Sequence, residues 1–249
     1  MDSEAVFTMQ GLVPGRIVSR YKRFLADVEL EDGRIVTAHC TNTGTMKTCW
    51  EPGDPVLLAP ADSPSRKLKY TWIACRRGEA WIGVETGLPN RIVARAARLD
   101  RLPGLPGLRD VRTEVPYGSE SSRIDVLARD ADGCPVYIEV KNTTLRIGDW
   151  ACFPDAVTER GVKHLRELRG MVRAGHRAAL VCFIHRSDVC AFDAAREIDV
   201  RYASELEVSA AEGVVILPVL AAIQAIREMN GTWGLAWHLD GLLPWQKRA

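Results

Sequence analysis

The 249-residue chain lacks the segments that carry a protein into or across a membrane. No apolar run approaches the roughly 20 residues that span a bilayer. The N-terminus, Met-Asp-Ser-Glu-Ala, has neither the basic region nor the apolar stretch of a secretory signal. We therefore expect a cytoplasmic protein with no membrane partner.

The cysteines and histidines lack the spacing of a zinc site. None of the seven cysteines forms a Cys-x-x-Cys pair, and the five histidines add no ligand pattern. Cys182 lies in an apolar run, and Cys40 and Cys75 lie in strand-like segments. We expect reduced and mainly structural cysteines.

The chain also has almost no net charge, because 33 Lys and Arg residues oppose 32 Asp and Glu residues. A nucleic-acid-binding surface would therefore be a local basic patch, not a property of the whole chain. Low-complexity tracts and internal repeats are absent. The apolar content of 47% suits one large globular domain or two small ones.

Two strand patterns joined by a tight turn form the most informative stretch. Apolar and polar residues alternate over 123–128 and 136–141, as in β-strands, where successive side chains point to opposite faces. The link Ala131-Asp132-Gly133 suits a three-residue hairpin loop, because glycine accepts a positive φ. Asp130 then faces Cys134.

Counting inward from that turn places Asp125 opposite Glu139, with Lys141 on the same face as Glu139. Directly opposed residues have Cβ atoms about 4.5–5.5 Å apart, and like charges there destabilise a sheet. A divalent cation such as Mg²⁺ would offset this repulsion, because hard cations take carboxylate oxygens as ligands. The alternative is a solvated polar face with a surface ion pair.

This hairpin resembles the catalytic core of the PD-(D/E)XK nuclease superfamily, in which an Asp and a Glu-x-Lys bind metal and activate water. The resemblance implies Asp125, Glu139 and Lys141 as catalytic residues, with Asp125 and Glu139 as ligands of Mg²⁺ or Mn²⁺. The Val140 carbonyl and Glu114, on the preceding strand, are further candidates for the site.

Other segments resemble the bacterial sugar fermentation stimulation protein family, in chain order from about Gly11 to Val200. These segments are Arg20–Val28, Asn42–Gly44, Lys67–Trp72, Ser122–Asp125, Ile138–Lys141 and Phe153–Leu168. The resemblance implies an OB-like N-terminal barrel over 1–86. It implies a PD-(D/E)XK, restriction-endonuclease-like α/β domain over 87–249, with core order α-β-β-β-α-β. One departure is Arg95, where the family implies an acidic residue that would assist a second metal.

The barrel assignment also follows from the residues, since six short strands with regular turn signals occupy 12–84. Such barrels bind single strands through a basic groove and aromatic platforms. The candidate nucleic-acid-binding residues are Arg16, Arg20, Lys22, Arg23, Asn42, Arg66, Lys67 and Lys69, with Lys163 in the second domain. Alternatively, Phe24 and Trp72 are barrel core and the cations only solubilise loops. The Asn42–Thr45 segment is either a binding loop or a turn.

The remaining elements are assigned from periodicity. Four helices are expected. The first begins at an Asn90 N-cap, and the second begins at Asp155 or Thr158 and runs to about Ala174. The other two cover 202–211 and 221–229. The expected strands cover 111–117, 177–185 and 214–217, with a turn at Gly118–Ser122, an irregular stretch over 142–149 and a loop or helix over 191–196. Thr158, Glu159, Lys163 and His164 either line the site or form a solvated helix face. Packing is the simplest role for the tail with Trp233, Trp237 and Trp245.

Three classes of function follow. The first is a metal-dependent nuclease that hydrolyses phosphodiester bonds in DNA or RNA. The second, implied by the family name, is a non-catalytic DNA-binding regulator of sugar (maltose-type) utilisation genes, although no helix-turn-helix signature supports it. The third is a scaffold with an inherited fold. A homodimer is left open.

Overall fold

The computed structural model describes residues 4–61, 63, 65–118 and 122–248. Within these residues the chain forms three helices and fifteen strands. The strands of the first part are β1 (Phe7–Tyr21), β2 (Leu25–Leu30), β3 (Ile35–His39), β4 (Pro55–Pro60), β5 (Tyr70–Arg77) and β6 (Ala80–Gly83). The second part begins with α1 (Leu88–Arg98), β7 (Arg109–Tyr117), β8 (Ser122–Arg129), β9 (Pro135–Thr143), β10 (Leu145–Ile147) and β11 (Trp150–Phe153). It continues with α2 (Glu159–Arg173), β12 (Arg177–Ile184), β13 (Ala191–Ala194), α3 (Val200–Ala211), β14 (Val215–Arg227) and β15 (Trp233–Leu242).

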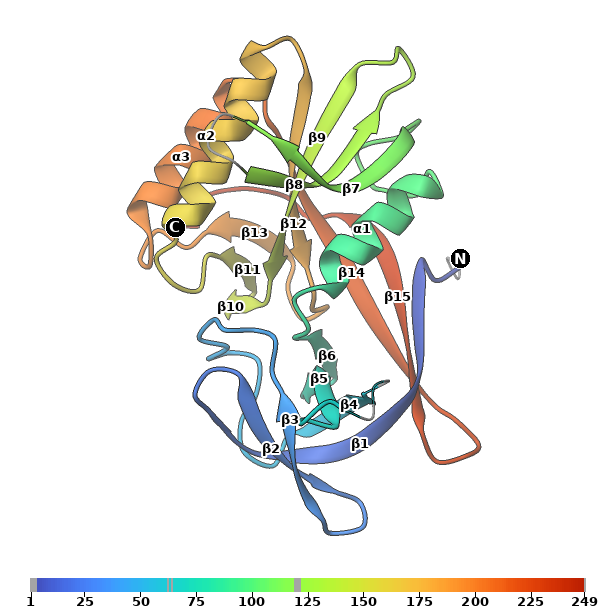
Figure 1. The fold of residues 1–249 in the computed structure, drawn as a ribbon. Helices are drawn as coiled ribbons and strands as arrows, with labels where there is room; N and C mark the ends of the chain where they lie inside the picture. The colour runs from blue at the N-terminus through green and yellow to red at the C-terminus, as the bar shows by residue number, and fades with distance from the viewer. Residues whose placement is uncertain (1–3, 62, 64, 119–121, 249) are drawn as a thin grey trace.

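The first five strands close into a small barrel, at the bottom of Figure 1. β1 pairs with both β2 and β4, β2 continues to β3, and β5 lies between β3 and β4, so the ring is complete. Trp72 is fully buried in the barrel core and donates its indole N–H to the Ala74 carbonyl at 3.0 Å. The predicted OB-like barrel is confirmed, and Trp72 is core instead of an exposed platform, whereas Phe24 is exposed.

The second part is an α/β unit around the sheet β15-β14-β12-β9-β8-β7. β9, β12 and β14 are parallel to one another, and the outer strands are antiparallel. α1 covers one face of this sheet, and α2 and α3 lie side by side on the other (Figure 1). The predicted restriction-endonuclease-like α/β architecture is confirmed. A short hairpin, β10–β11, lies between β9 and α2 and pairs with β13.

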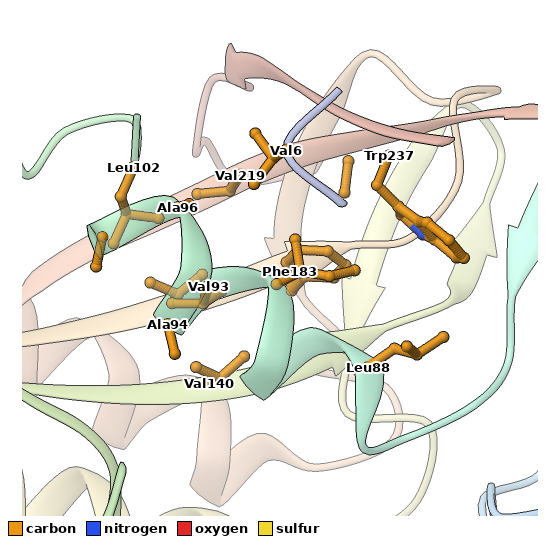
Figure 2. Packing of buried hydrophobic residues seen from close by; sticks show 14 of the residues in the cluster. Val6, Leu88, Val93, Ala94, Ala96, Leu102, Val140, Phe183, Val219 and Trp237 are labelled. Atoms are coloured by element: carbon orange, nitrogen blue, oxygen red, sulfur yellow. The ribbon is translucent and has the colours of Figure 1, made fainter. Parts of the chain in front are cut away.

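The core under α1 follows from period-two alternation in the strands and a 3.6-residue stripe in the helix. Val93 and Ala96 of α1 point toward Val140, Phe183 and the neighbouring strands (Figure 2). Leu180, Cys182 and Ile184 of β12 point to the opposite face, under α2 and α3. Helices therefore cover both faces of the sheet. This packing holds the polar ends of β8 and β9 in a fixed position.

The long strand β1 joins the barrel to this sheet. Its first residues, from Phe7 to Leu12, pair with β15, and its second half belongs to the barrel. Trp237 of β15 is fully buried and donates to His185 Nε2 at 2.6 Å. The expected packing role of the tail is thus confirmed for Trp237. The boundary after residue 86 stays a prediction, and that position falls between β6 and α1.

Several expected elements were wrong. The stretch 142–149 is not irregular, because β9 runs to Thr143 and β10 follows, and 191–194 forms β13. Residues 221–227 continue β14 instead of forming a helix. Alanines hid the period-two alternation there, and pairing with β15 overrides their helix propensity. The Gly118–Ser122 turn lies largely outside the described residues.

The helix predicted to start at an Asn90 N-cap begins earlier, at Leu88, with Gly87 as N-cap and Pro89 in its first turn. The other predicted helix start, Thr158, is confirmed, since its side chain accepts from the Gly161 N–H. All seven cysteines are free. No helix among the described residues is long and apolar enough to cross a membrane.

Candidate functional site

The hairpin β8–β9 has the register that its turn predicted. The Asp130 N–H donates to the Cys134 carbonyl at 3.0 Å, and Gly133 has a φ of +81°. The paired residues run inward from Arg129 and Pro135 to Val126 and Ile138. The next pair in this count is Asp125 with Glu139, at the end of the ladder.

The backbone of Asp125 does not continue the pairing with β9. Its side chain makes the contact with that strand instead. Its Oδ2 accepts from the backbone N–H of Val140 at 2.7 Å, and its Oδ1 accepts from Asn90 Nδ2 of α1 at 2.6 Å. Asn90 is therefore part of the site and not a helix cap. The sequence offered no signal for this role, because only the packing of α1 on the sheet brings Asn90 to β8.

Glu139 lies on the face of β9 that α2 covers, and it is only 2% exposed. Lys141 Nζ donates to Glu139 Oε1 at 2.6 Å and lies 3.1 Å from His164 Nδ1. His164 Nδ1 also contacts Glu139 Oε1. The structure thus brings His164 into the site, whereas the sequence left it between this role and a solvated face. Glu139 Oε2 is buried and has no hydrogen-bond partner among the described residues.

The two carboxylates have opposite electrostatic environments. Burial raises the pKa of Asp125 to about 7, and repulsion from Glu139 and Glu114 adds to this effect against the Val140 N–H and Lys141. Burial also acts to raise the pKa of Glu139, but Lys141 and His164 outweigh it and hold that pKa below its usual value. Two carboxyl groups whose pKa values shift in opposite directions are a frequent feature of functional sites.

A second buried acid lies close by. Glu167 of α2 is 5% exposed, and its carboxylate lies beside the Tyr117 hydroxyl. Burial raises the pKa of the Tyr117 hydroxyl, and the negative charges of Glu139, Glu167 and Asp125 raise it further. Sequence reasoning missed Glu167 because it occurs among charged residues that resemble a solvated helix face.

The other candidates from the sequence lie at the edge of the site or away from it. Glu114 is exposed on β7. Its negative charge repels that of Asp125 and so raises the Asp125 pKa. Arg95 donates to the Val6 carbonyl at 2.6 Å. Thr158 caps α2 and donates its backbone N–H to Asp199 at 2.9 Å, so it acts as a structural residue.

A divalent cation fits Asp125 and Glu139 on two grounds. The unpartnered Glu139 Oε2 offers a ligand atom, and a cation between the carboxylates would remove the repulsion that raises the Asp125 pKa. Among the described residues no three His, Cys, Asp or Glu side chains are grouped to hold a metal ion. A hard cation held by these two carboxylates would complete its coordination shell with water and phosphate oxygens.

The basic residues predicted to bind nucleic acid separate into two groups. Arg20 supports the barrel, since its guanidinium donates to the carbonyls of Arg23, Asn42 and Gly44 at 2.8–2.9 Å. Asn42 is buried and accepts from the Gly44 N–H at 2.9 Å. The sequence did not separate these supporting roles from surface roles.

The second group lies on the surface. Arg16 is exposed and donates to the Gly53 carbonyl, and Arg66 lies 3.2 Å from His39 Nδ1. The exposed side chains are Lys22 and Arg23 in the β1–β2 turn and Lys67 and Lys69 before β5. Lys163 lies with Arg160, Arg166, Arg201 and Glu159 around a shallow depression formed by α2 and the start of α3.

Known proteins match this chain over nearly its full length. Residues 18–84 match the model of the SfsA N-terminal OB domain, and residues 87–226 match that of the sugar fermentation stimulation protein RE domain. A sugar fermentation stimulation protein homolog of Geotalea uraniireducens is 50% identical over 212 residues, covering 85% of this chain and 91% of that protein. The homolog of Gloeobacter violaceus is 48% identical over 213 residues, covering 86% and 90%.

A solved structure with a similar fold is that of Pyrococcus furiosus SfsA in complex with Ca²⁺. Its TM-score is 0.83 at 26% sequence identity, and the match covers 98% of this chain and 100% of the other.

Proposed function

Because the chain belongs to the sugar fermentation stimulation protein (SfsA) family, we propose that it binds nucleic acid and hydrolyses phosphodiester bonds with a divalent cation, Mg²⁺ or Mn²⁺, at Asp125 and Glu139. The observation that carries this proposal is the buried pair itself. Two carboxylates lie at the open end of the β8–β9 ladder, one with a free ligand atom and one with its pKa raised to about 7.

The family supports the choice of cation class. The related Pyrococcus furiosus protein is in complex with Ca²⁺, which is a hard cation like Mg²⁺. When bound, such an ion supplies a Lewis-acidic charge beside a phosphate and a water of lowered pKa.

The protein's own residues would position this chemistry. The Val140 N–H and Asn90 orient the Asp125 carboxylate, and they favour its ionised form. Lys141 Nζ donates to Glu139 Oε1 at 2.6 Å, and another of its N–H groups can donate to a phosphate oxygen. His164 Nδ1 contacts both Lys141 Nζ and Glu139 Oε1, so His164 is a positioning residue.

Nucleic acid would reach this site across exposed cations. Those of the barrel, Lys22, Arg23, Lys67 and Lys69, provide charge for phosphates. Of the cations around Lys163, Arg160 and Arg166 lie on α2, the helix that carries His164, and Arg201 lies on α3. Phosphate contacts of this kind position a strand without reading its sequence.

The test is cleavage of labelled single-stranded and duplex DNA and RNA with Mg²⁺ or Mn²⁺. We expect cleavage by the wild type and at least about a 100-fold loss for Glu139→Gln and for Lys141→Ala, with binding retained. Glu79→Ala, at a side chain that is 96% exposed in the β5–β6 turn, is the matched control and should cleave normally.

The non-catalytic regulator of sugar-utilisation genes is the second candidate. The observation in its favour is that no third metal-binding side chain joins Asp125 and Glu139 in the described part of the chain. Tight binding by the wild type and both variants, without cleavage under either metal, would refute the nuclease and favour the regulator.

A further inference from the structure

A pocket of about 370 Å³ lies where the barrel meets the α/β unit, within the size range of pockets for small ligands, roughly 300–1,000 Å³. Its walls include the loop after β3 and the segment from β11 to the start of α2. The barrel contributes Arg23, Asn42–Gly44 and Thr86, and the α/β unit contributes Asn142, Thr144 and the segment 152–158. Neither half of the molecule forms this pocket alone.

The walls of the pocket are held rigidly. The Thr45 N–H donates to Asp155 Oδ2 at 2.8 Å, which fastens the barrel loop to the segment before α2. The Arg20 guanidinium donates hydrogen bonds to the Asn42 and Gly44 carbonyls and so holds the same loop in place. A Cβ on Gly44 would lie 2.2 Å from Asp155 Oδ2, so this approach requires glycine. A preformed pocket binds with little loss of conformational freedom.

The Asn142 carboxamide lines this pocket with no internal partner. Its Nδ2 and Oδ1 are both buried, and neither has a hydrogen-bond partner among the described residues. An unsatisfied buried polar group costs about 1–3 kcal/mol, so it needs a specific reason to persist. A carboxamide presents one donor and one acceptor side by side in a plane, which complements the edge of a nucleobase.

The position of Asn142 ties this pocket to the proposed reaction. Asn142 directly follows Lys141 on β9, and Thr158 in the pocket wall caps the helix that carries His164. Val157 on the rim is apolar yet 73% exposed, which leaves a surface for a flat ligand to cover. An occupant would therefore lie at the end of β9, one residue beyond Lys141 on the strand that carries Glu139.

We propose that this interdomain pocket receives one unpaired nucleobase of the substrate strand and that Asn142 hydrogen-bonds to its edge. The inference rests on the proposed function and specifies its substrate class. A base inside a duplex stack cannot enter a pocket, so the substrate is single-stranded or carries an extruded nucleotide. Arg23 at the rim contacts the adjoining phosphate.

The test measures binding alone, with the wild-type chain in the presence of a chelator so that no cleavage occurs. Single-stranded oligonucleotides of one length each carry a single abasic position, moved one nucleotide at a time, and affinity is read from fluorescence anisotropy. We expect one position at which loss of the base weakens binding roughly 10-fold or more. In Asn142→Ala this position-specific loss should disappear.

Asn230→Ala, in the turn between β14 and β15, is the matched control and should keep the position-specific loss. Oligonucleotide binding with a flat abasic profile, or a profile unchanged in Asn142→Ala, would overturn this inference and leave the proposed function standing. No binding to any of these single strands would also overturn this inference, and the cleavage assay on duplexes would then decide the proposed function separately.

Discussion

The Asp125 carboxylate accepts a hydrogen bond of 2.7 Å from the backbone N–H of Val140, the residue between Glu139 and Lys141. This contact replaces the backbone pairing that would otherwise extend the β8–β9 ladder. It fixes the acidic side chain of one strand relative to the Glu-x-Lys of the next. The Asp125 carboxylate is thus held directly beside the residue that follows Glu139.

The first prediction concerns stability without divalent cations. The pKa of Asp125 is raised to about 7 in the folded protein, so this group stabilises the fold fully below its unfolded pKa of about 4, and the contribution is lost as the pH rises through 7. The slope is at most about 1.4 kcal/mol per pH unit. His185 opposes it, because burial lowers the His185 pKa to about 3.

The comparison is therefore between wild type and Asp125→Asn, since both retain His185. Urea unfolding in a chelator at about pH 5 and about pH 8 should show that the wild type loses stability relative to Asp125→Asn as the pH rises. Parallel pH dependence in the two proteins would contradict the raised pKa.

The second prediction concerns cation binding. An ionised Asp125 is needed as a ligand, so the affinity for Ca²⁺, used as a probe that does not depend on cleavage, should fall roughly 10-fold for each pH unit below about 7. Calorimetric titration at several pH values measures this. Glu139→Gln should abolish the binding, and an affinity independent of pH between about 5 and 8 would refute the assignment.

The third prediction concerns Asn90. Its Nδ2 donates to Asp125 Oδ1 at 2.6 Å, and loss of this donor raises the pKa of Asp125 further. Asn90→Ala should therefore weaken Ca²⁺ binding roughly 10-fold near pH 7, with the affinity recovering at higher pH. A merely structural role would not give this recovery. Arg98→Ala, on the same helix, is the control.

The fourth prediction separates two basic residues that looked alike in the sequence. Lys163 lies in a surface cluster of cations, so Lys163→Ala should weaken nucleic-acid binding for all sequences and reduce the salt slope by about 1. Arg20 is engaged with three backbone carbonyls, so Arg20→Ala should lower the unfolding free energy by about 1–3 kcal/mol. Equal salt slopes in Lys163→Ala and the wild type would exclude Lys163 from the binding surface.

The fifth prediction concerns the junction of the two halves. Gly44→Ala places a Cβ 2.2 Å from Asp155 Oδ2 and should cost about 1–3 kcal/mol, measured by urea unfolding. Gly170→Ala is the control, because nothing lies within 4 Å of its Cβ in α2. That change should be neutral or stabilise by up to about 1 kcal/mol.

Local patterns in the sequence are enough to predict the hairpin register, the barrel strands and the helix that Thr158 caps. Each depends on local information: period-two alternation, a glycine at a turn, or a capping side chain within one helical turn. These rules placed Asp125, Glu139 and Lys141 on neighbouring strands. They failed over 221–227, where alanines suit both periodicities and only the pairing with β15 decides for a strand.

The surroundings of those three residues depend on how the helices and the two halves of the molecule pack. Asn90 and His164 reach the site from helices on opposite faces of the sheet, 35 and 25 residues away from Asp125 and Glu139. The carbonyls of Asn42 and Gly44 reach Arg20 across 22 and 24 residues of the barrel, and the pocket at Asn142 requires both halves of the molecule to be in place. Periodicity records which face a side chain occupies, whereas the partner on that face depends on long-range packing, which no local pattern encodes.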